Sequence, residues 1–343
     1  MRPNFRVTTT EALLTEDKTV SKSKAKWPYV FAALGAMLYS MKAVFVKMAY
    51  LPGGGISAND LEAITLMALR MGFALPVYVA VLVISLRRSD KRLPLKYIMQ
   101  AGAMGVMGYH LCTYIDFEGL KLITAQLERL LLFTYPVFVV IFGAIFFGTK
   151  ITRLGVLAIV LAYSGLGIVF IGGDIAVGVN VPLGSALIIG AAIIFALFQL
   201  GAMRLIGRLG SQVFTCMAMI SAATTIVLHF IVQSVSQGGI GQALDLPPRI
   251  YLIAGMIAFF STVLPSFLTN ISIGKIGAQS VAVMAMLGPI ATIVAAVIIL
   301  GEPFSLWDGV GTFVTLCGIG FYMWQNARKP QMVSPVKPNS DKA

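Results

Sequence analysis

The chain has 343 residues, of which 58% are hydrophobic and only 12% charged, about half the charged fraction of ordinary soluble proteins. This composition excludes a soluble globular enzyme. Because apolar runs of roughly 20 residues recur along the chain, it predicts an all-α integral membrane protein. The net charge of +12 comes from basic residues in short loops and tails, which indicates membrane orientation rather than binding to nucleic acid.

The polar segment at residues 1–27 is expected to be a disordered cytoplasmic tail, and residues 326–343 form a similar tail. Between them, apolar runs bounded by Gly, Pro, Asn or charged residues predict ten transmembrane helices. The first run is too long for a signal-peptide core and lacks a small-residue cleavage site, so we expect it to stay uncleaved. The expected ranges are 28–50, 61–86, 97–119, 122–147, 152–172, 182–202, 212–233, 250–271, 276–300 and 305–325.

Basic residues are divided unevenly between the two sets of loops. If the N-terminal tail is cytoplasmic, 20 of the 26 Lys and Arg residues fall in cytoplasmic segments. The opposite segments hold two, Lys121 and Arg249, and the other four lie inside predicted spans. Cytoplasmic loops of membrane proteins carry an excess of Lys and Arg, so both termini are predicted to be cytoplasmic. The protein is expected in the cell membrane. A missed or extra helix would have mixed the two sets, which supports a count of ten.

Two segments resemble each other at a constant offset of 153 residues. The segment ITAQLERLLLFTYPVFVVIFGAIFFG at 123–148 aligns without a gap with IGAQSVAVMAMLGPIATIVAAVIILG at 276–301. The chain is therefore interpreted as a duplication, with five helices in each of the regions 28–172 and 182–325. Five is odd, so the second half enters the membrane from the opposite side, which makes an inverted repeat. The matched pairs are Ile123 with Ile276, Ala125 with Ala278, Gln126 with Gln279, Pro136 with Pro289, and Gly148 with Gly301.

These motifs resemble those of the drug/metabolite transporter superfamily, in particular its EamA family. The family shows an Ala-Gln step, a mid-helix Pro and a Gly-Glu end to the fourth helix of each half. The first half of this chain departs from the pattern, with Gly148-Thr149 in place of Gly-Glu and LYSMKAVFVKMAY in place of a Trp-Gly-Ser-Asn-like step. The resemblance covers about residues 28–325 and implies a transporter, export being the commoner assignment. The matching motifs here are Ala278-Gln279, Pro289 and Gly301-Glu302.

Five ionisable residues from four predicted helices share one depth. At about 1.5 Å of rise per residue, each lies roughly 10 to 15 Å below the outer surface. Charges inside membrane spans usually face the bundle interior and find partners there. Adjacent residues on a helix point about 100° apart, so we expect Glu128 and Arg129 to contact different partners. The five residues are Lys42, Arg70, His110, Glu128 and Arg129.

Three cations beside one carboxylate predict a positive surplus suited to a carboxylate or other anionic group of a substrate. Lys42 or Arg70 is the expected partner of Glu128. Tyr109 shares a helical face with Asp116 at the i, i+7 spacing and is expected to line the substrate site. Tyr135, seven residues beyond Glu128, is a further substrate-binding candidate. Asp116, near the outer end of its helix, is expected to be solvated. A buried ionic network that only fixes helix register is the alternative.

No phosphate-binding loop and no zinc-binding motif occurs, so we expect no cofactor, no metal and no catalytic residue. A membrane transferase with Glu128 or His110 as base is an alternative, but the chain has no loop large enough for a head group. A passive channel is another, although its pore would need polar linings in both halves. The sequence therefore predicts a secondary transporter of a small polar or amphipathic metabolite, such as an amino acid or organic anion. A homodimer is an open possibility.

Overall fold

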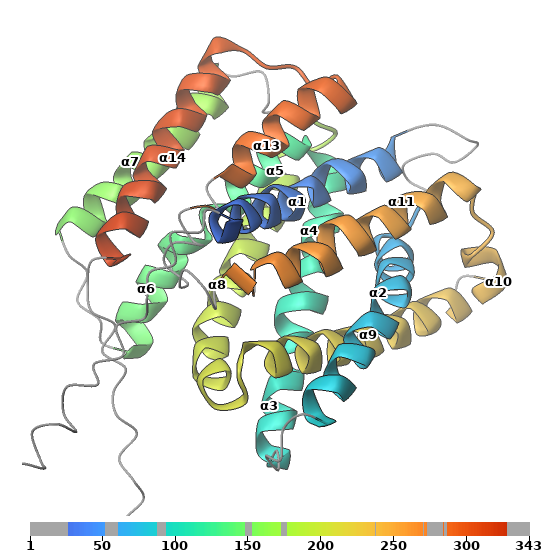
Figure 1. Cartoon of the computed structure of the whole chain (residues 1–343). Helices are drawn as coiled ribbons and strands as arrows, with labels where there is room; N and C mark the ends of the chain where they lie inside the picture. Colours follow the sequence, from blue (N-terminus) through green and yellow to red (C-terminus); the bar gives the residue numbers. More distant parts are fainter. Residues whose placement is uncertain are drawn as a thin grey trace, which may run out of the picture.

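The computed structural model describes residues 27–51, 61–87, 94–147, 153–172, 177–236, 238–269, 271–272, 284 and 287–327. These residues form helices (Figure 1), and no strand occurs among them. Both predicted tails lie outside the described residues except at their inner ends, as do Gly148-Thr149 and Ala278-Gln279.

Within the described residues, the first half of the chain contains seven α-helices and one π-helical segment. The helix predicted at 97–119 is longer than expected and has a π-helical middle, and the one predicted at 122–147 is divided in two. The elements are α1 (Trp27–Tyr50), α2 (Ala63–Arg87), α3 (Leu95–Gly105), η1 (Val106–Leu111), α4 (Cys112–Leu122), α5 (Ala125–Leu132), α6 (Tyr135–Phe147) and α7 (Arg153–Gly172).

In the second half, the helix predicted at 182–202 continues to Leu209, so the basic residues of its last turns belong to the helix. The prediction ended it too early, because Lys and Arg were read as loop signals although they are good helix formers. The elements are α8 (Val181–Leu209), α9 (Ser211–Ser236), α10 (Ile240–Ala243), α11 (Pro248–Ala258), η2 (Phe259–Val263), α13 (Leu287–Ala295), η3 (Ala296–Leu300) and α14 (Leu306–Ala327).

The division between α5 and α6 lies directly before a proline. Phe133 and Thr134 form a turn, in which the Thr134 amide donates to the Leu131 carbonyl at 3.0 Å. Pro136 has no amide hydrogen to donate to the carbonyl four residues before it, so the hydrogen bonds of a continuous helix are interrupted at this turn. The two helices together still form one membrane-crossing segment, Ala125–Phe146.

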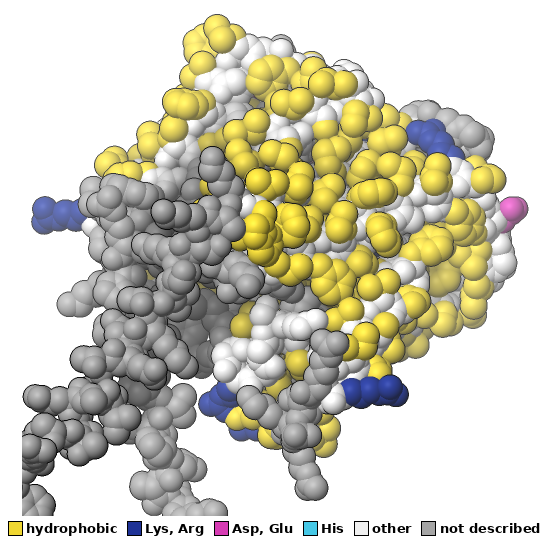
Figure 2. Space-filling view, viewed as in Figure 1, with side chains coloured by type: hydrophobic (Ala, Val, Ile, Leu, Met, Phe, Trp, Pro, Cys, Tyr) yellow, Lys and Arg dark blue, Asp and Glu magenta, His cyan; other side chains and the backbone are white. Residues whose placement is uncertain are grey.

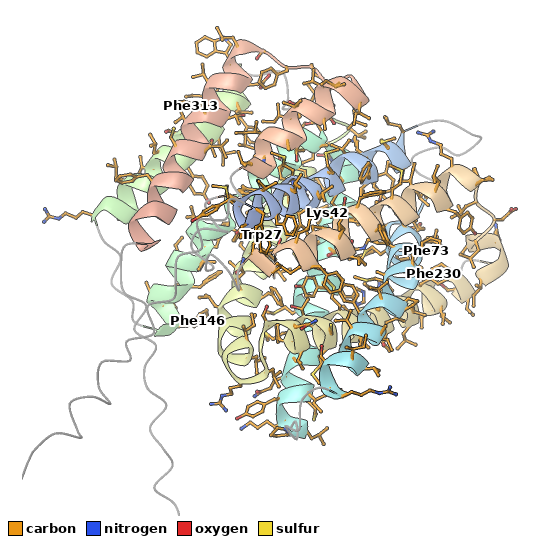
Figure 3. All side chains as sticks on the ribbon, viewed as in Figure 1. Trp27, Lys42, Phe73, Phe146, Phe230 and Phe313 are labelled. Carbon is orange, nitrogen blue, oxygen red and sulfur yellow. The ribbon has the colours of Figure 1, made fainter. Side chains whose placement is uncertain are left out.

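The outer surface is that of a protein surrounded by lipid. Within the described residues, six helices are long and apolar enough to cross a membrane. Yellow side chains cover most of the face in Figure 2, with Lys and Arg near its edges, and large apolar side chains such as Phe146 and Phe313 lie exposed on α6 and α14 (Figure 3). The protein is therefore an all-α, multi-pass membrane protein. The six helices are Trp27–Tyr50, Ala63–Arg87, Ala125–Phe146, Val181–Leu209, Ser211–Ser236 and Pro248–Thr269.

Helices α7 and α14, far apart in the sequence, run side by side (Figure 1). A side chain on Gly165 would meet the backbone oxygen of Gly311 at 2.5 Å, and one on Gly311 would meet the Gly165 oxygen at 2.6 Å. The two glycines therefore permit the close approach, as small residues do between membrane helices. Contacts of α1 with α13 and of α2 with α9 also join the two halves.

Replacing Gly165 by Ala should destabilise this contact by about 1–3 kcal/mol, since the added methyl group meets backbone that cannot rotate away. Gly167, one half-turn further along α7, has nothing within 4 Å of the position of a Cβ atom and is the matched control. Thermal unfolding in detergent should show a lower Tm for Gly165→Ala than for Gly167→Ala. Equal Tm values would contradict the packing described here.

Candidate functional site

The charged residues inside the bundle begin with an ion pair between α1 and α4. Lys42 Nζ donates to Asp116 Oδ2 at 2.5 Å, and Asp116 is only 1% exposed. Figure 3 labels Lys42 on α1. The expectation that Asp116 is solvated was wrong, because α4 turns its carboxylate toward α1 and away from solvent. A buried carboxylate needs a cation, and Lys42 supplies it.

Glu128 and Arg129 on α5 contact each other, contrary to the expectation of separate partners. The distance from Arg129 Nε to Glu128 Oε2 is 3.6 Å, and Glu128 is 0% exposed. Arg129 also donates through Nη2 to the backbone oxygen of Ser40 at 3.2 Å, an oxygen that Thr292 on α13 shares at 3.0 Å. The long Arg side chain can fold back along the helix to its neighbour, which the Cα geometry alone did not reveal.

The carboxyl groups of Asp116 and Glu128 are close enough to act on each other electrostatically, and both are influenced by Lys42 and Arg129. We call these four residues the charge cluster. Two cations balance two carboxylates within this cluster, and with neighbouring Arg70 the positive surplus is one charge rather than the two predicted from the sequence. The additional carboxylate is that of Asp116, which was expected to be solvated.

Arg70 on α2 lies beside the charge cluster. Its guanidinium carbon is 5.6 Å from the centre of the Phe117 ring, and Lys42 Nζ is 5.8 Å from the same centre. Arg70 is 4% exposed, and the charge of Asp116 acts on it. An aromatic ring attracts a cation by about 0.5–2 kcal/mol, so Phe117 helps to hold both cations.

Several buried polar atoms of the cluster and of neighbouring Arg70 make no hydrogen bond within the part of the chain that the structure describes. They include both Oε atoms of Glu128, Oδ1 of Asp116, and Nε of Arg70 and Arg129. A buried polar group without a hydrogen bond costs roughly 1–3 kcal/mol, more when it is charged. These atoms could therefore bind the polar groups of a small molecule or a proton.

Two further charged residues hold the junction between α4 and α5. Lys47 donates to the backbone oxygens of Leu120 at 3.0 Å and Ile123 at 2.7 Å. Glu302 accepts from the backbone amide of Ala125 at 2.8 Å and from that of Gln126 at 3.2 Å. Sequence reasoning treated Glu302 only as part of the Gly-Glu motif, and that motif was the available signal.

Tyr109 and Tyr135 do not touch the charge cluster but belong to one row of aromatic rings. Tyr109 meets Phe198 at 5.1 Å between ring centres, and Tyr135 meets Phe195 at 4.9 Å. Phe195 and Phe198 are stacked on α8 at 5.9 Å, which completes the row. Edge-to-face pairs at these distances are favourable, so packing explains both tyrosines.

His110 lies away from the charge cluster and faces α9. Its Nε2 is 3.1 Å from Nδ1 of His229, and its Nδ1 is 3.0 Å from the hydroxyl oxygen of Thr225. The chain has only two histidines, and the structure brings them together. The sequence placed His110 at the depth of the charged residues but did not pair it with His229, because depth does not give direction around the helix axis.

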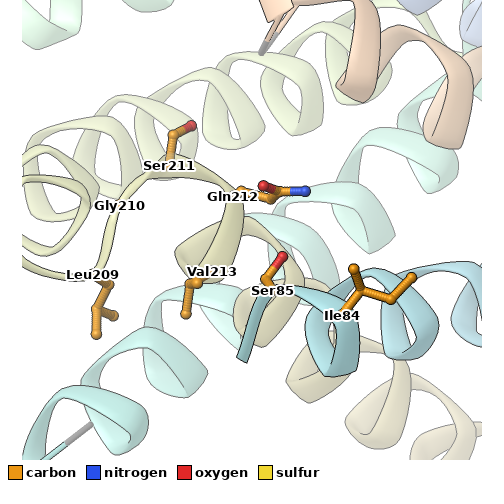
Figure 4. Close-up of a pocket in the computed structure, with 7 residues that line it drawn as sticks. All are labelled: Ile84, Ser85, Leu209, Gly210, Ser211, Gln212 and Val213. Carbon is orange, nitrogen blue, oxygen red and sulfur yellow. The ribbon is translucent and has the colours of Figure 1, made fainter. Parts of the chain in front are cut away.

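Both cavities described here lie away from the charge cluster. One, of about 360 Å³, is formed by Ile84 and Ser85 at the end of α2 with residues 209–213 at the α8–α9 turn (Figure 4). The other, of about 490 Å³, is an apolar groove between α13 and α14. Asp116, Glu128 and Arg129 are buried among the described residues, whereas the Lys42 side chain is 16% exposed, so this conformation encloses three of the four charges of the cluster.

The model of the EamA-like transporter family matches residues 26–171 and 182–324, more than half of the chain. This chain belongs to that family. Two matched regions also establish a two-repeat architecture. The uncharacterized transporter YcbK of Bacillus subtilis (strain 168) is 24% identical over 303 residues, which cover 88% of this chain and 95% of YcbK. A solved crystal structure covers 87% of this EamA-like chain and 98% of its own, with 16% identity and a TM-score of 0.57, which shows the fold alone.

Asp116→Asn should lower the free energy of unfolding by about 2–4 kcal/mol, because it leaves the partly buried Lys42 without its anion. Lys42→Met in the same chain should recover much of the loss. Glu118→Gln is the control: Glu118 pairs with Lys121 at 3.1 Å in a more exposed place, where ion pairs contribute less than about 1 kcal/mol. Thermal unfolding of the unchanged protein and these variants measures the effects. Similar losses for Asp116→Asn and Glu118→Gln would contradict the buried pair.

The contact between His110 and His229 should appear as a coupling energy. Each single alanine variant removes the hydrogen bond, so the double variant should be less destabilised than the sum, by about 0.5–1.5 kcal/mol. A double-mutant cycle of unfolding free energies in detergent provides the measurement. Strict additivity would show that the histidines do not interact.

Proposed function

We propose that this EamA-like protein is a secondary transporter of a small zwitterionic metabolite, for which an amino acid is the model. The single observation that carries the proposal is the charge cluster: two cations and two carboxylates, enclosed in the bundle, with several atoms that make no hydrogen bond among the described residues. Charged residues inside membrane spans mark substrate or ion pathways by default.

The presence of two buried carboxylates beside the cations favours a zwitterion over a simple anion. An ammonium group would interact with Glu128 or Asp116, and a carboxylate with Arg129 or Arg70. A purely anionic substrate would meet two buried carboxylates and their repulsion. Tyr109 and Tyr135 are retained as proposed contacts for the apolar part of an amphipathic substrate, since their aromatic row lies on η1 and α6, the elements that adjoin α4 and α5 in the chain.

For the fold, the proposal retains ten membrane helices in two inverted repeats, with both termini cytoplasmic. The 153-residue offset and the distribution of Lys and Arg support it. Export is proposed on the basis of the family resemblance. Glu128, a fully buried carboxyl group that interacts with that of Asp116, is the proposed site of proton exchange.

Cysteine labelling tests the proposed orientation. Single cysteines at Gly54 and Gly239 should react with an impermeant reagent added outside intact cells, and one at Ser334 should react only after the membrane is opened. Labelling of all three from outside would exclude cytoplasmic termini. A chain without the introduced cysteines, and with its native ones replaced by serine, provides the background.

Transport can be measured in vesicles that contain the purified protein, with a panel of radiolabelled amino acids and organic acids. We expect counterflow of at least one amino acid, which a channel does not show, and recovery of that compound chemically unchanged, which separates transport from catalysis. Glu128→Gln and Arg129→Gln should each lower the initial rate about tenfold or more, since a hydrogen bond to a charged group contributes about 1.5–3 kcal/mol.

Glu118→Gln is the matched control, because it removes the same charge from the more exposed pair with Lys121. Its rate should equal that of the unchanged protein. The Tm of each preparation is measured alongside. If Glu128→Gln lowers Tm and yield but the surviving protein transports normally, the charge cluster serves only to fix helix register and the proposed site is wrong.

A further inference from the structure

The segment that follows η3 in the second repeat makes three hydrogen bonds to the beginning of α5 in the first repeat. Glu302 accepts from the amides of Ala125 and Gln126, and the Gln126 side chain donates through Nε2 to the Pro303 carbonyl at 3.1 Å. The partners are 176 or 177 residues apart in the chain. The Ala-Gln and Gly-Glu motifs, singled out separately in the sequence, are therefore in contact.

This contact satisfies a physical need of α5. The first amides of a helix have no partner within the helix, and its N-terminus attracts negative charge. Thr124 accepts from the Leu127 amide at 3.2 Å, and Glu302 takes the two amides that come before it. The amide groups at the beginning of α5 are thus hydrogen-bonded by one residue of their own repeat and one of the other.

The contact also fixes the charge cluster. Helix α5 has only eight residues, and Glu128 and Arg129 are its fourth and fifth. A displacement of its first turn therefore displaces both charged side chains. Lys47 holds the preceding end of α4, and the charge of Glu302 acts on it. The α4–α5 junction is thereby held by a cation at one helix end and an anion at the other.

We propose that Glu302 is a positioning residue that locks the beginning of α5, and with it Glu128 and Arg129, to the second repeat in the enclosed conformation. The inference rests on the proposed function, since alternating access requires the two repeats to move against each other. Release of Glu302 from α5 then precedes exposure of the charge cluster. This role needs a carboxylate, because each of the two Glu302 carboxylate oxygens accepts one amide hydrogen of α5.

Hydrogen exchange of the full-length protein, reconstituted in phosphatidylcholine vesicles and measured by mass spectrometry, tests the lock without any substrate. Glu302→Gln leaves one acceptor oxygen but replaces the other by an amide that cannot accept, and removes the charge. In the peptide that contains residues 123–132, the amide hydrogens from the beginning of α5 up to Arg129 should then exchange about tenfold faster or more. Glu302→Asp keeps the charge on a shorter side chain and should restore much of the protection.

Asp308→Asn is the matched control, six residues further along. Asp308 accepts from the amide and hydroxyl of Ser305 at 2.8 and 2.9 Å, at the beginning of α14 in its own repeat. This variant should accelerate exchange in α14 and leave residues 123–132 unchanged. If Glu302→Gln and Asp308→Asn each accelerated exchange to a similar degree in residues 123–132 and in α14, Glu302 would have only a general structural role. That result would overturn the proposal.

The outcome is separable from that of the transport assay. Unchanged exchange in Glu302→Gln overturns the lock even if vesicles transport an amino acid. Accelerated exchange limited to α5, in vesicles that transport no compound of the panel, supports the contact and overturns the proposed function on which its role rests. Accelerated exchange together with a changed rate of amino acid counterflow supports both.

Discussion

The physical constraint on which this structure depends is the high free energy of a charge surrounded by lipid. Several ionisable side chains are buried in a bundle whose exterior is apolar, and each must find an opposite charge or a backbone dipole. Lys42 satisfies Asp116, Arg129 reaches both Glu128 and a carbonyl of α1, and Lys47 caps the end of α4. These contacts bind α1, α4 and α5 together, so the arrangement of the helices and the charge cluster cannot be separated.

The family motifs acquire a mechanical meaning in this context. An Ala-Gln step and a Gly-Glu end look like unrelated features of similar helices in the sequence. In the structure, the Gly-Glu end of one repeat caps the helix that the Ala-Gln step of the other repeat begins. The first half has Thr149 in place of that glutamate, so its Gly-Glu position carries no carboxylate.

The fold class and the helices were accessible from the sequence, because apolar runs of membrane-spanning length are a strong signal. The family model agrees with the predicted relationship to EamA transporters and with two repeats. The site was less accessible. Depth along a helix placed Lys42, Glu128 and Arg129 in one layer, but depth does not give direction around the helix axis. His110 was therefore placed among the charges, whereas it contacts His229. Asp116 was expected in solvent because its helix was predicted to end at residue 119, whereas α4 continues to Leu122 and Asp116 pairs with Lys42.

The π-helical segment η1 changes the direction in which the side chains on either side of it point, which the sequence did not predict. A π-helical turn accommodates one more residue than an α-helical turn, so the residues after it are rotated by about 100° relative to those before. Tyr109, inside η1, consequently faces α8, while Asp116, beyond it, faces α1. Deleting one residue from Val106–Leu111 would leave α3 in place and swing the acidic face of α4 toward a different neighbour. The number of residues in this single π-helical turn thus determines which neighbouring helices the Asp116 carboxylate can contact.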